Sequence, residues 1–136
     1  MNDNAKLVRE LCDLMVKRDA EAVRPYFAAD AVYQNTGMEA TVGVDAIVAN
    51  LAGQFGMFAD SYEYRIQNLV ADGAVVLTER LDMIRSGDGK LHGVPVMGTF
   101  VVKDGKIRRW TDYWDTALPA KMMTGEDYST LVPDKY

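Results

Sequence analysis

The chain has 136 residues, of which 49% are hydrophobic and 26% are charged, a composition typical of one globular domain covering residues 1–136. Its formal net charge of −5 argues against a nucleic-acid partner, because nucleic-acid binding requires a basic surface. No apolar stretch approaches the ~20 residues of a membrane-spanning helix, and the first residues lack the pattern of a signal peptide. The single cysteine, Cys12, excludes an internal disulfide bond, so we expect a cytoplasmic protein without membrane contact.

The only cysteine and the only histidine are poor candidates for catalysis or metal binding. Cys12 occupies an apolar helical position beside Leu11 and Met15, which indicates packing. His92 follows a predicted turn, and we expect it at the surface or at the rim of a site. Zinc sites usually need three or four His or Cys ligands, and a magnesium site made only of carboxylates stays open but has no recognisable spacing. We therefore predict no metal and no cofactor.

The first 56 residues are predicted to be mostly helical. Apolar residues at helical spacing indicate a first helix that Asp3 or Asn4 caps. A second, short helix is expected over residues 19–27. Residues 31–35 are predicted to form a short strand, and a third amphipathic helix follows over residues 43–56.

From residue 60 onward the pattern changes to strands. Asp-Gly pairs, which are typical of hairpin turns, recur sixteen residues apart at residues 72–73, 88–89 and 104–105. They predict an antiparallel meander of four strands over residues 60–71, 74–86, 90–102 and 106–116. The expected fold is α+β, with three N-terminal helices covering one face of a curved sheet.

The equal spacing of the turns also predicts which residues are neighbours across the sheet. If each turn is a type I turn with a glycine bulge, one row contains Tyr64, Arg80, Val96 and Asp112. The next row on the same face contains Tyr62, Asp82, Val94 and Trp114. With two-residue turns Met97 replaces Val96, but Arg80 and Asp112 still share a row. Since strands lie ~4.8 Å apart, an arginine can span the intervening strand, which predicts a carboxylate–arginine–carboxylate bridge.

Two carboxylates that share one arginine can perform acid–base catalysis. One stays ionised and takes a proton from water, while the other is held protonated by its surroundings and donates. Tyr33 and Asn35, two residues apart on the predicted strand, can orient that water. The alternative interpretation is a stabilising ion network on a solvent-exposed face. The Tyr, Val, Met and Trp residues between the charged positions favour a buried concave face instead.

Several segments resemble the limonene-1,2-epoxide hydrolase family, and the resemblance extends from about residue 5 to residue 117. The segments that carry it are residues 32–35, 51–53, 78–82, 105–107 and 110–115. The resemblance implies the cone-shaped α+β fold of the nuclear transport factor 2-like superfamily, usually dimeric, with a pocket inside the curved sheet. It also implies cofactor-free, single-step opening of an epoxide to a vicinal diol.

The resemblance assigns roles to five residues. Asp112 matches the base that activates water, Asp82 matches the acid that protonates the epoxide oxygen, and Arg80 matches the bridge between them. Tyr33 and Asn35 match the pair that holds the water. We predict that the substrate contacts Phe58, Tyr64, Ile84, Val94, Val96 and Trp114. Because the segment after Trp114 follows no recognised family pattern, we expect a small cyclic or aromatic epoxide without favouring limonene oxide.

Other functions occur on the same fold, so the fold alone does not determine the reaction. A ketosteroid isomerase or a polyketide cyclase would use one aspartate as base and oxyanion donors in place of the second acid. Such an enzyme would have little use for Tyr33 and Asn35. A non-catalytic binding domain would keep its ligand affinity after Asp112→Asn.

We also expect a homodimer. The family resemblance suggests it, and the last strand presents Trp110, Tyr113 and Trp114, more large side chains than the pocket needs. Tyr113 is predicted to point away from Asp112, toward the opposite face of the sheet.

Overall fold

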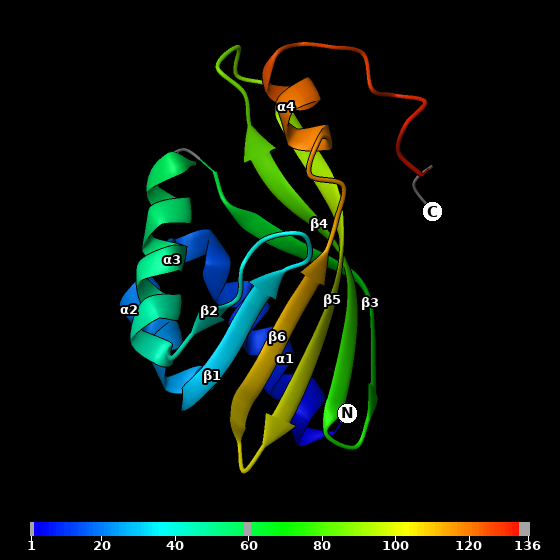
Figure 1. The fold of residues 1–136 in the computed structure, drawn as a ribbon. Helices are drawn as coiled ribbons and strands as arrows, with labels where there is room; N and C mark the ends of the chain where they lie inside the picture. Colours follow the sequence, from blue (N-terminus) through cyan, green and yellow to red (C-terminus); the bar gives the residue numbers. More distant parts are fainter. Residues whose placement is uncertain (1, 59–60, 134–136) are drawn as a thin grey trace.

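The structure is a computed structural model that describes residues 2–58 and 61–133. One six-stranded sheet has the strand order β2-β1-β6-β5-β4-β3, and helices cover one of its faces (Figure 1). The strands are β1 (Phe27–Asn35), β2 (Thr41–Val42), β3 (Glu63–Asp72), β4 (Val75–Arg85), β5 (Leu91–Lys103) and β6 (Lys106–Tyr113). The helices are α1 (Asp3–Leu14), α2 (Ala20–Val23), α3 (Val44–Met57) and α4 (Leu118–Met123), with short 3₁₀ turns η1 (Met15–Lys17) and η2 (Arg24–Tyr26). The predicted α+β class is confirmed.

The three predicted N-terminal helices are present, with corrections at their ends. Helix α1 is capped by Asn2 and not by Asp3 or Asn4, because the Asn2 side-chain oxygen accepts a hydrogen bond from the Ala5 N–H at 2.7 Å. The second helix was predicted too long: it tightens into η2, and Phe27 already belongs to β1. Helix α3 begins after Gly43, as predicted. Strand β2 and helix α4 were not predicted, and residue 60, the predicted start of the first strand of the meander, lies outside the described residues.

The predicted rows across the sheet are correct in the centre and wrong on both sides. Arg80 pairs with Val96 and Asp82 pairs with Val94 in the β4–β5 ladder, as expected. Tyr64, however, lies opposite Asp82 and not opposite Arg80. Asp112 lies opposite Gly98 and does not share a row with Arg80.

The error arises because the three Asp-Gly turns are not of one type. The central loop over residues 87–89 has three residues, with Gly89 at φ 86°, as the bulged type predicts. The outer two turns are two-residue loops, since Asp72 pairs with Val75 and Lys103 pairs with Lys106. A β-bulge follows in each outer pair. Beyond the bulge each outer strand is shifted by two residues in total, so Tyr64 and Asp112 stay on the predicted face.

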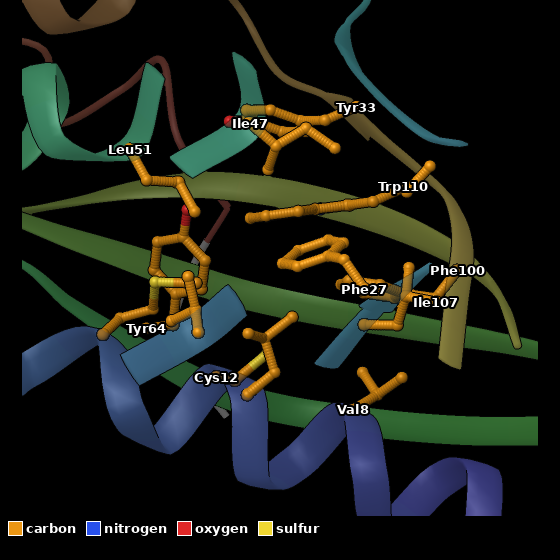
Figure 2. Packing of buried hydrophobic residues seen from close by; sticks show 14 of the residues in the cluster. Val8, Cys12, Phe27, Tyr33, Ile47, Leu51, Tyr64, Phe100, Ile107 and Trp110 are labelled. Carbon is orange, nitrogen blue, oxygen red and sulfur yellow. The ribbon is translucent and has the colours of Figure 1, made fainter. Parts of the chain in front are cut away.

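The inner face of the sheet, which faces the helices, carries the hydrophobic core. Trp110 is completely buried there, with its ring 4.2 Å from that of Tyr33 and 5.4 Å from that of Phe100, centroid to centroid (Figure 2). Helix α1 adds a stripe at helical spacing, formed by Val8, Leu11 and Cys12, which Met15 of η1 continues. Burial raises the pKa of the Cys12 thiol to about 12, which fits a packing residue and not a nucleophile.

The outer face of the sheet, opposite the helices, is partly apolar and exposed. Its exposed hydrophobic residues include Val75, Leu77, Met97 and Tyr113. Met97 and Tyr113 are cross-strand neighbours in the β5–β6 ladder. Among the residues that the structure describes, no helix has both the length and the apolar character needed to cross a membrane.

Candidate active site

Arg80, on β4, is the centre of the buried charged cluster on the inner face. Its side chain is fully buried, and its guanidinium donates two hydrogen bonds to each of two carboxylates. Nε and Nη2 each lie 2.9 Å from an oxygen of Asp82. Nη2 and Nη1 lie 2.9 and 3.2 Å from the oxygens of Asp112, on β6. The structure therefore contains an Asp82–Arg80–Asp112 bridge, which crosses β5 diagonally and not within one row.

Gly98 on β5 makes this crossing possible. It lies directly opposite Asp112, under the path of the Arg80 side chain. A Cβ atom at this position would lie 2.7 Å from Asp112 Oδ1 and 2.9 Å from Thr78 Oγ1, and closer still to Arg80 Nη1. Sequence reasoning missed Gly98, although a glycine inside a strand is a known signal for a close approach.

The two carboxylates have different surroundings. Asp112 is 2% exposed, and its carboxylate accepts hydrogen bonds from the N–H groups of Arg80 and from the indole Nε1 of Trp110, the latter at 2.7 Å. Asp82 keeps 18% of its side chain exposed. Burial raises the pKa of Asp82 from 3.8 to about 6, against the opposing effect of Arg80, and the negative charge of Asp112 adds to the rise. Asp82 can therefore hold a proton in a range where an ordinary aspartate has lost it.

Tyr33 and Asn35 reach the cluster because β1 runs parallel to β6. In this pairing Asn35 lies opposite Asp112 and Tyr33 lies opposite Trp110. The Asn35 side-chain Nδ2 donates to the Tyr33 hydroxyl at 3.2 Å. Successive inward-facing residues of one short strand thus place a phenol and an amide beside the aspartate.

These groups border a pocket with a volume of about 420 Å³ on the inner face. Tyr33, Asn35, Asp82 and Asp112 contribute to its wall, whereas Arg80 lies behind the two carboxylates. All six residues predicted to contact the substrate lie in the wall: Phe58, Tyr64, Ile84, Val94, Val96 and Trp114. Their binding role stays a prediction.

Six further wall residues were not predicted as part of the site: Met38, Asn50, Gln54, Met57, Tyr62 and Pro119. Asn50 and Gln54 are one helical turn apart on α3, and the Gln54 Nε2 donates to Asn50 Oδ1 at 2.8 Å. Each amide directly precedes a buried apolar residue of α3, Leu51 and Phe55 respectively. Two amide side chains four residues apart on a helix can contact each other, and this spacing could have indicated from the sequence that they belong to the site.

The apolar end of the pocket is closed by α4. Its residues Leu118 and Met122 pack with Ile84, Val94 and Val96 of the sheet. Pro119 contributes directly to the pocket wall. Part of the pocket wall is therefore formed by the segment that follows the last strand.

His92 is buried, which corrects the prediction of a surface or rim position. It is 3% exposed, and its ring nitrogens contact Ser86 Oγ at 2.9 Å and Tyr128 Oη at 2.6 Å. Burial lowers the pKa of His92, which favours the neutral imidazole. The residue that covers it, Tyr128, belongs to the C-terminal segment, whose path the sequence pattern did not indicate.

The described residues contain no group of three or more His, Cys, Asp or Glu side chains placed to hold a metal ion. The chemistry available in the pocket is proton transfer between two carboxyl groups of unequal character, with polar groups that can orient a small nucleophile.

The fold is similar to that of nuclear transport factor 2-like and SnoaL-like domains. A putative SnoaL-like polyketide cyclase from Jannaschia sp. CCS1 superposes with a TM-score of 0.78 at 17% identity, over 91% of this chain and 93% of that one. An identity this low shows the shared fold alone.

Three further comparisons identify the family. The sequence model of the limonene-1,2-epoxide hydrolase catalytic domain matches residues 2–123. Epoxide hydrolase EphG of Mycobacterium tuberculosis is 32% identical over 111 residues, which are 79% of this chain and 70% of that protein. The structure of an M. tuberculosis LEH-like epoxide hydrolase superposes with a TM-score of 0.75 at 28% identity, over 96% of each chain. The chain belongs to the limonene-1,2-epoxide hydrolase family.

Proposed function

We propose that this protein hydrolyses a small cyclic or aromatic epoxide to a vicinal diol in one step, without a cofactor. The observation that supports it most directly is the pair of unequal carboxylates held by one buried arginine at the wall of a 420 Å³ pocket. Membership of a family of epoxide hydrolases supports the same reaction.

In the proposed mechanism Asp112 is the base. Tyr33 and Asn35 hold a water molecule, Asp112 takes one of its protons, and the water oxygen forms a bond to an epoxide carbon. Asp82, whose pKa is raised to about 6, donates its proton to the epoxide oxygen as the carbon–oxygen bond of the ring breaks. The diol leaves with the ring oxygen and the water oxygen on neighbouring carbons.

Arg80 keeps the buried cluster electrically neutral throughout. Before the reaction one aspartate is charged and the other is protonated, and after it the two have exchanged states. The arginine contacts both carboxylates in either case, so the proton shift leaves no unpaired charge in the buried site. Exchange with solvent through the partly exposed Asp82 then restores the starting state.

Other reactions on this fold make different demands. An isomerase or a cyclase transfers a proton to or from a substrate carbon and needs one base with oxyanion donors. The bidentate arrangement of Arg80 on a second aspartate, together with the Tyr33–Asn35 pair, suits water activation better. A binding domain would need none of these proton-transfer groups.

A panel of cyclic and aromatic epoxides, including limonene oxide, cyclohexene oxide and styrene oxide, tests the proposal. The wild-type protein is expected to form a vicinal diol from at least one of them, with equal rates before and after chelator treatment. Asp112→Asn is expected to abolish turnover. Absence of diol from every compound, or turnover that survives Asp112→Asn, would contradict the proposed reaction.

We also propose a homodimer formed through the outer face of the sheet. Of the three side chains expected to contribute, Trp110 is fully buried in the core and Trp114 lines the pocket, whereas Tyr113 is 52% exposed on the outer face beside Met97. Apolar side chains gathered on one face favour burial against a second copy. Light scattering should give about twice the 15.1 kDa chain mass, and Met97→Glu should lower it toward a monomer. A mass near 15 kDa for the wild type at micromolar concentration would exclude a stable dimer.

A further inference from the structure

The hydroxyl of Tyr33 has only one hydrogen-bonding role left to fill. Its oxygen accepts one hydrogen bond from Asn35 Nδ2 and another from Gln54 Nε2, each at 3.2 Å. A phenol oxygen accepts at most two hydrogen bonds and donates one. With both acceptor positions occupied by amide N–H groups, Tyr33 can interact with a further partner only by donating its proton.

The Asn35 amide is fixed in its orientation by Trp114. The indole Nε1 donates to Asn35 Oδ1 at 2.8 Å, and an indole nitrogen can only donate. The Asn35 oxygen must therefore face Trp114, and its nitrogen must face Tyr33. A reversed amide would bring two donors together at Trp114.

Gln54 is held in a similar way from α3. Its Nε2 donates to Asn50 Oδ1 at 2.8 Å as well as to Tyr33, and its Oε1 accepts a hydrogen bond from the Tyr62 hydroxyl. Asn50 in turn donates to Thr41 Oγ1 at 3.1 Å. Both hydrogens of the Gln54 amide are thus used: one is donated to Tyr33, and the other is donated to Asn50, which in turn donates to Thr41.

We propose that Gln54 and Trp114 are positioning residues that set the direction of hydrogen bonding around the attacking water. This inference rests on the proposed function. Gln54 and Trp114 oblige Tyr33 to donate to the water, while Asp112 and the second lone pair of Asn35 Oδ1 can only accept from it. A water that accepts one hydrogen bond and donates two keeps one lone pair free, which is the pair that attacks the epoxide carbon.

The central test is Gln54→Met, which keeps the length of the side chain and removes its donors without adding charge. We expect kcat to fall about 10-fold with KM changed less than about 2-fold, because the residue acts on the water and not on the substrate. Gln54→Glu has nearly the shape of glutamine but can only accept when ionised. It is expected to turn the Tyr33 hydroxyl toward itself and to lower kcat by about 100-fold.

A double-mutant cycle with Tyr33→Phe separates this role from a structural one. Without the Tyr33 hydroxyl, Gln54→Met should lower kcat by less than about 2-fold, because there is no phenol left to orient. If Gln54→Met costs the same factor in both backgrounds, Gln54 does not act through Tyr33 and the inference is wrong. Trp114→Phe, which keeps an aromatic ring but removes the N–H, should show the same non-additivity with Asn35→Ala.

Gln67→Glu is the matched control, since Gln67 is exposed on β3 and outside the pocket. It should leave kcat, KM and the thermal midpoint unchanged. Circular dichroism compares each Gln54 variant with the wild type and detects any loss of the fold. If a variant unfolds, Gln54→Asn is measured in its place, and it should also lower kcat. An active wild type with unaltered kcat in Gln54→Met and Gln54→Glu would overturn this inference alone. An inactive wild type would overturn the proposed function.

Discussion

The two ends of the pocket are built from different parts of the chain. The polar end consists of residues on three strands of one sheet, β1, β6 and β4: Tyr33, Asn35, Asp112, Arg80 and Asp82. At the apolar end, Ile84, Val94 and Val96 of the sheet meet Leu118 and Met122 of α4, which the C-terminal segment follows. The polar groups are held by the sheet and by hydrogen bonds to one another, whereas the apolar wall depends on a short helix packed over the end of the strands (Figure 1).

This difference suggests that the polar end determines the chemical step and that the apolar end determines which substrate fits. Changes at the polar end should alter the chemical step, because they displace proton donors and acceptors. Changes at the apolar end should alter which epoxide fits, because they reshape a wall without touching the charged cluster. Substitutions at each end can separate the two effects.

The largest effects are expected from the charged cluster itself. We expect kcat to fall at least ~100-fold in each of three variants. Asp112→Asn removes the base, Asp82→Asn removes the acid, and Arg80→Ala removes the group that holds both. Steady-state kinetics with any accepted epoxide measures the loss, and circular dichroism checks the fold. Asp104→Asn, in an exposed turn where asparagine suits the positive φ of 54°, is the control and should retain full activity. Loss of less than ~10-fold in the Asp82 variant would remove the need for a second acid.

Gly98→Ala should lower kcat at least ~10-fold, because a Cβ atom would push the Arg80 guanidinium away from Asp112. Gly93→Ala on the same strand is a matched control. Its Cβ would meet Met83 and Leu81 at 3.2–3.4 Å on the outer face, and activity should be retained. Equal activity of both variants would mean that the bridge across β5 is dispensable.

The pH dependence of the enzyme should reflect Asp82. Because the acid must be protonated, kcat/KM should fall tenfold per pH unit above about 6, the value to which burial raises the pKa of Asp82. The folded state binds this proton more tightly than the unfolded state, whose pKa is near 3.8. The stabilisation is therefore present below pH 3.8 and is lost as the pH rises through about 6. Thermal melting from pH 4 to 7 should show this loss in the wild type and a smaller one in Asp82→Asn; parallel curves would contradict the assignment.

The smallest effect is expected at the apolar end. Tyr128→Phe removes the hydroxyl that contacts His92 Nδ1 at 2.6 Å and loosens the segment after α4. We expect KM to rise about 2- to 5-fold for the bulkiest accepted epoxide, with kcat for the smallest one unchanged. Parallel measurements on the two substrates test this. An equal loss of kcat for both would mean that the two ends of the pocket are not independent.

The polar end could largely be predicted from the sequence because side chains alternate strictly along a strand. Asp82 and Arg80 are two residues apart, and the same holds for Tyr33 and Asn35, so each pair shares a face whatever the register. Even the wrong register for Asp112 preserved its face, since a two-residue loop and a bulge together shift the strand by two residues. The type of each Asp-Gly turn depends on local backbone angles that the dipeptide does not fix.

The features of the site that the sequence did not predict depend on contacts between distant parts of the chain. Gly98 matters only because an arginine from the neighbouring strand passes over it. His92 is hydrogen-bonded to Tyr128, which lies 36 residues further along the chain and contacts its ring. Helix α4 is short and is held by packing against the sheet, so its sequence carries little helical signal of its own.

The central claim is that water, activated by Asp112, attacks the epoxide directly. A single turnover with enzyme in excess over epoxide, in oxygen-18 water, tests this most directly, with mass spectrometry of both the diol and the peptide that contains Asp112. The proposed mechanism predicts one oxygen-18 atom in the diol and none in Asp112, because no covalent ester forms. An unlabelled diol together with oxygen-18 in the Asp112 carboxylate would contradict it, since that result requires the aspartate itself to be the nucleophile.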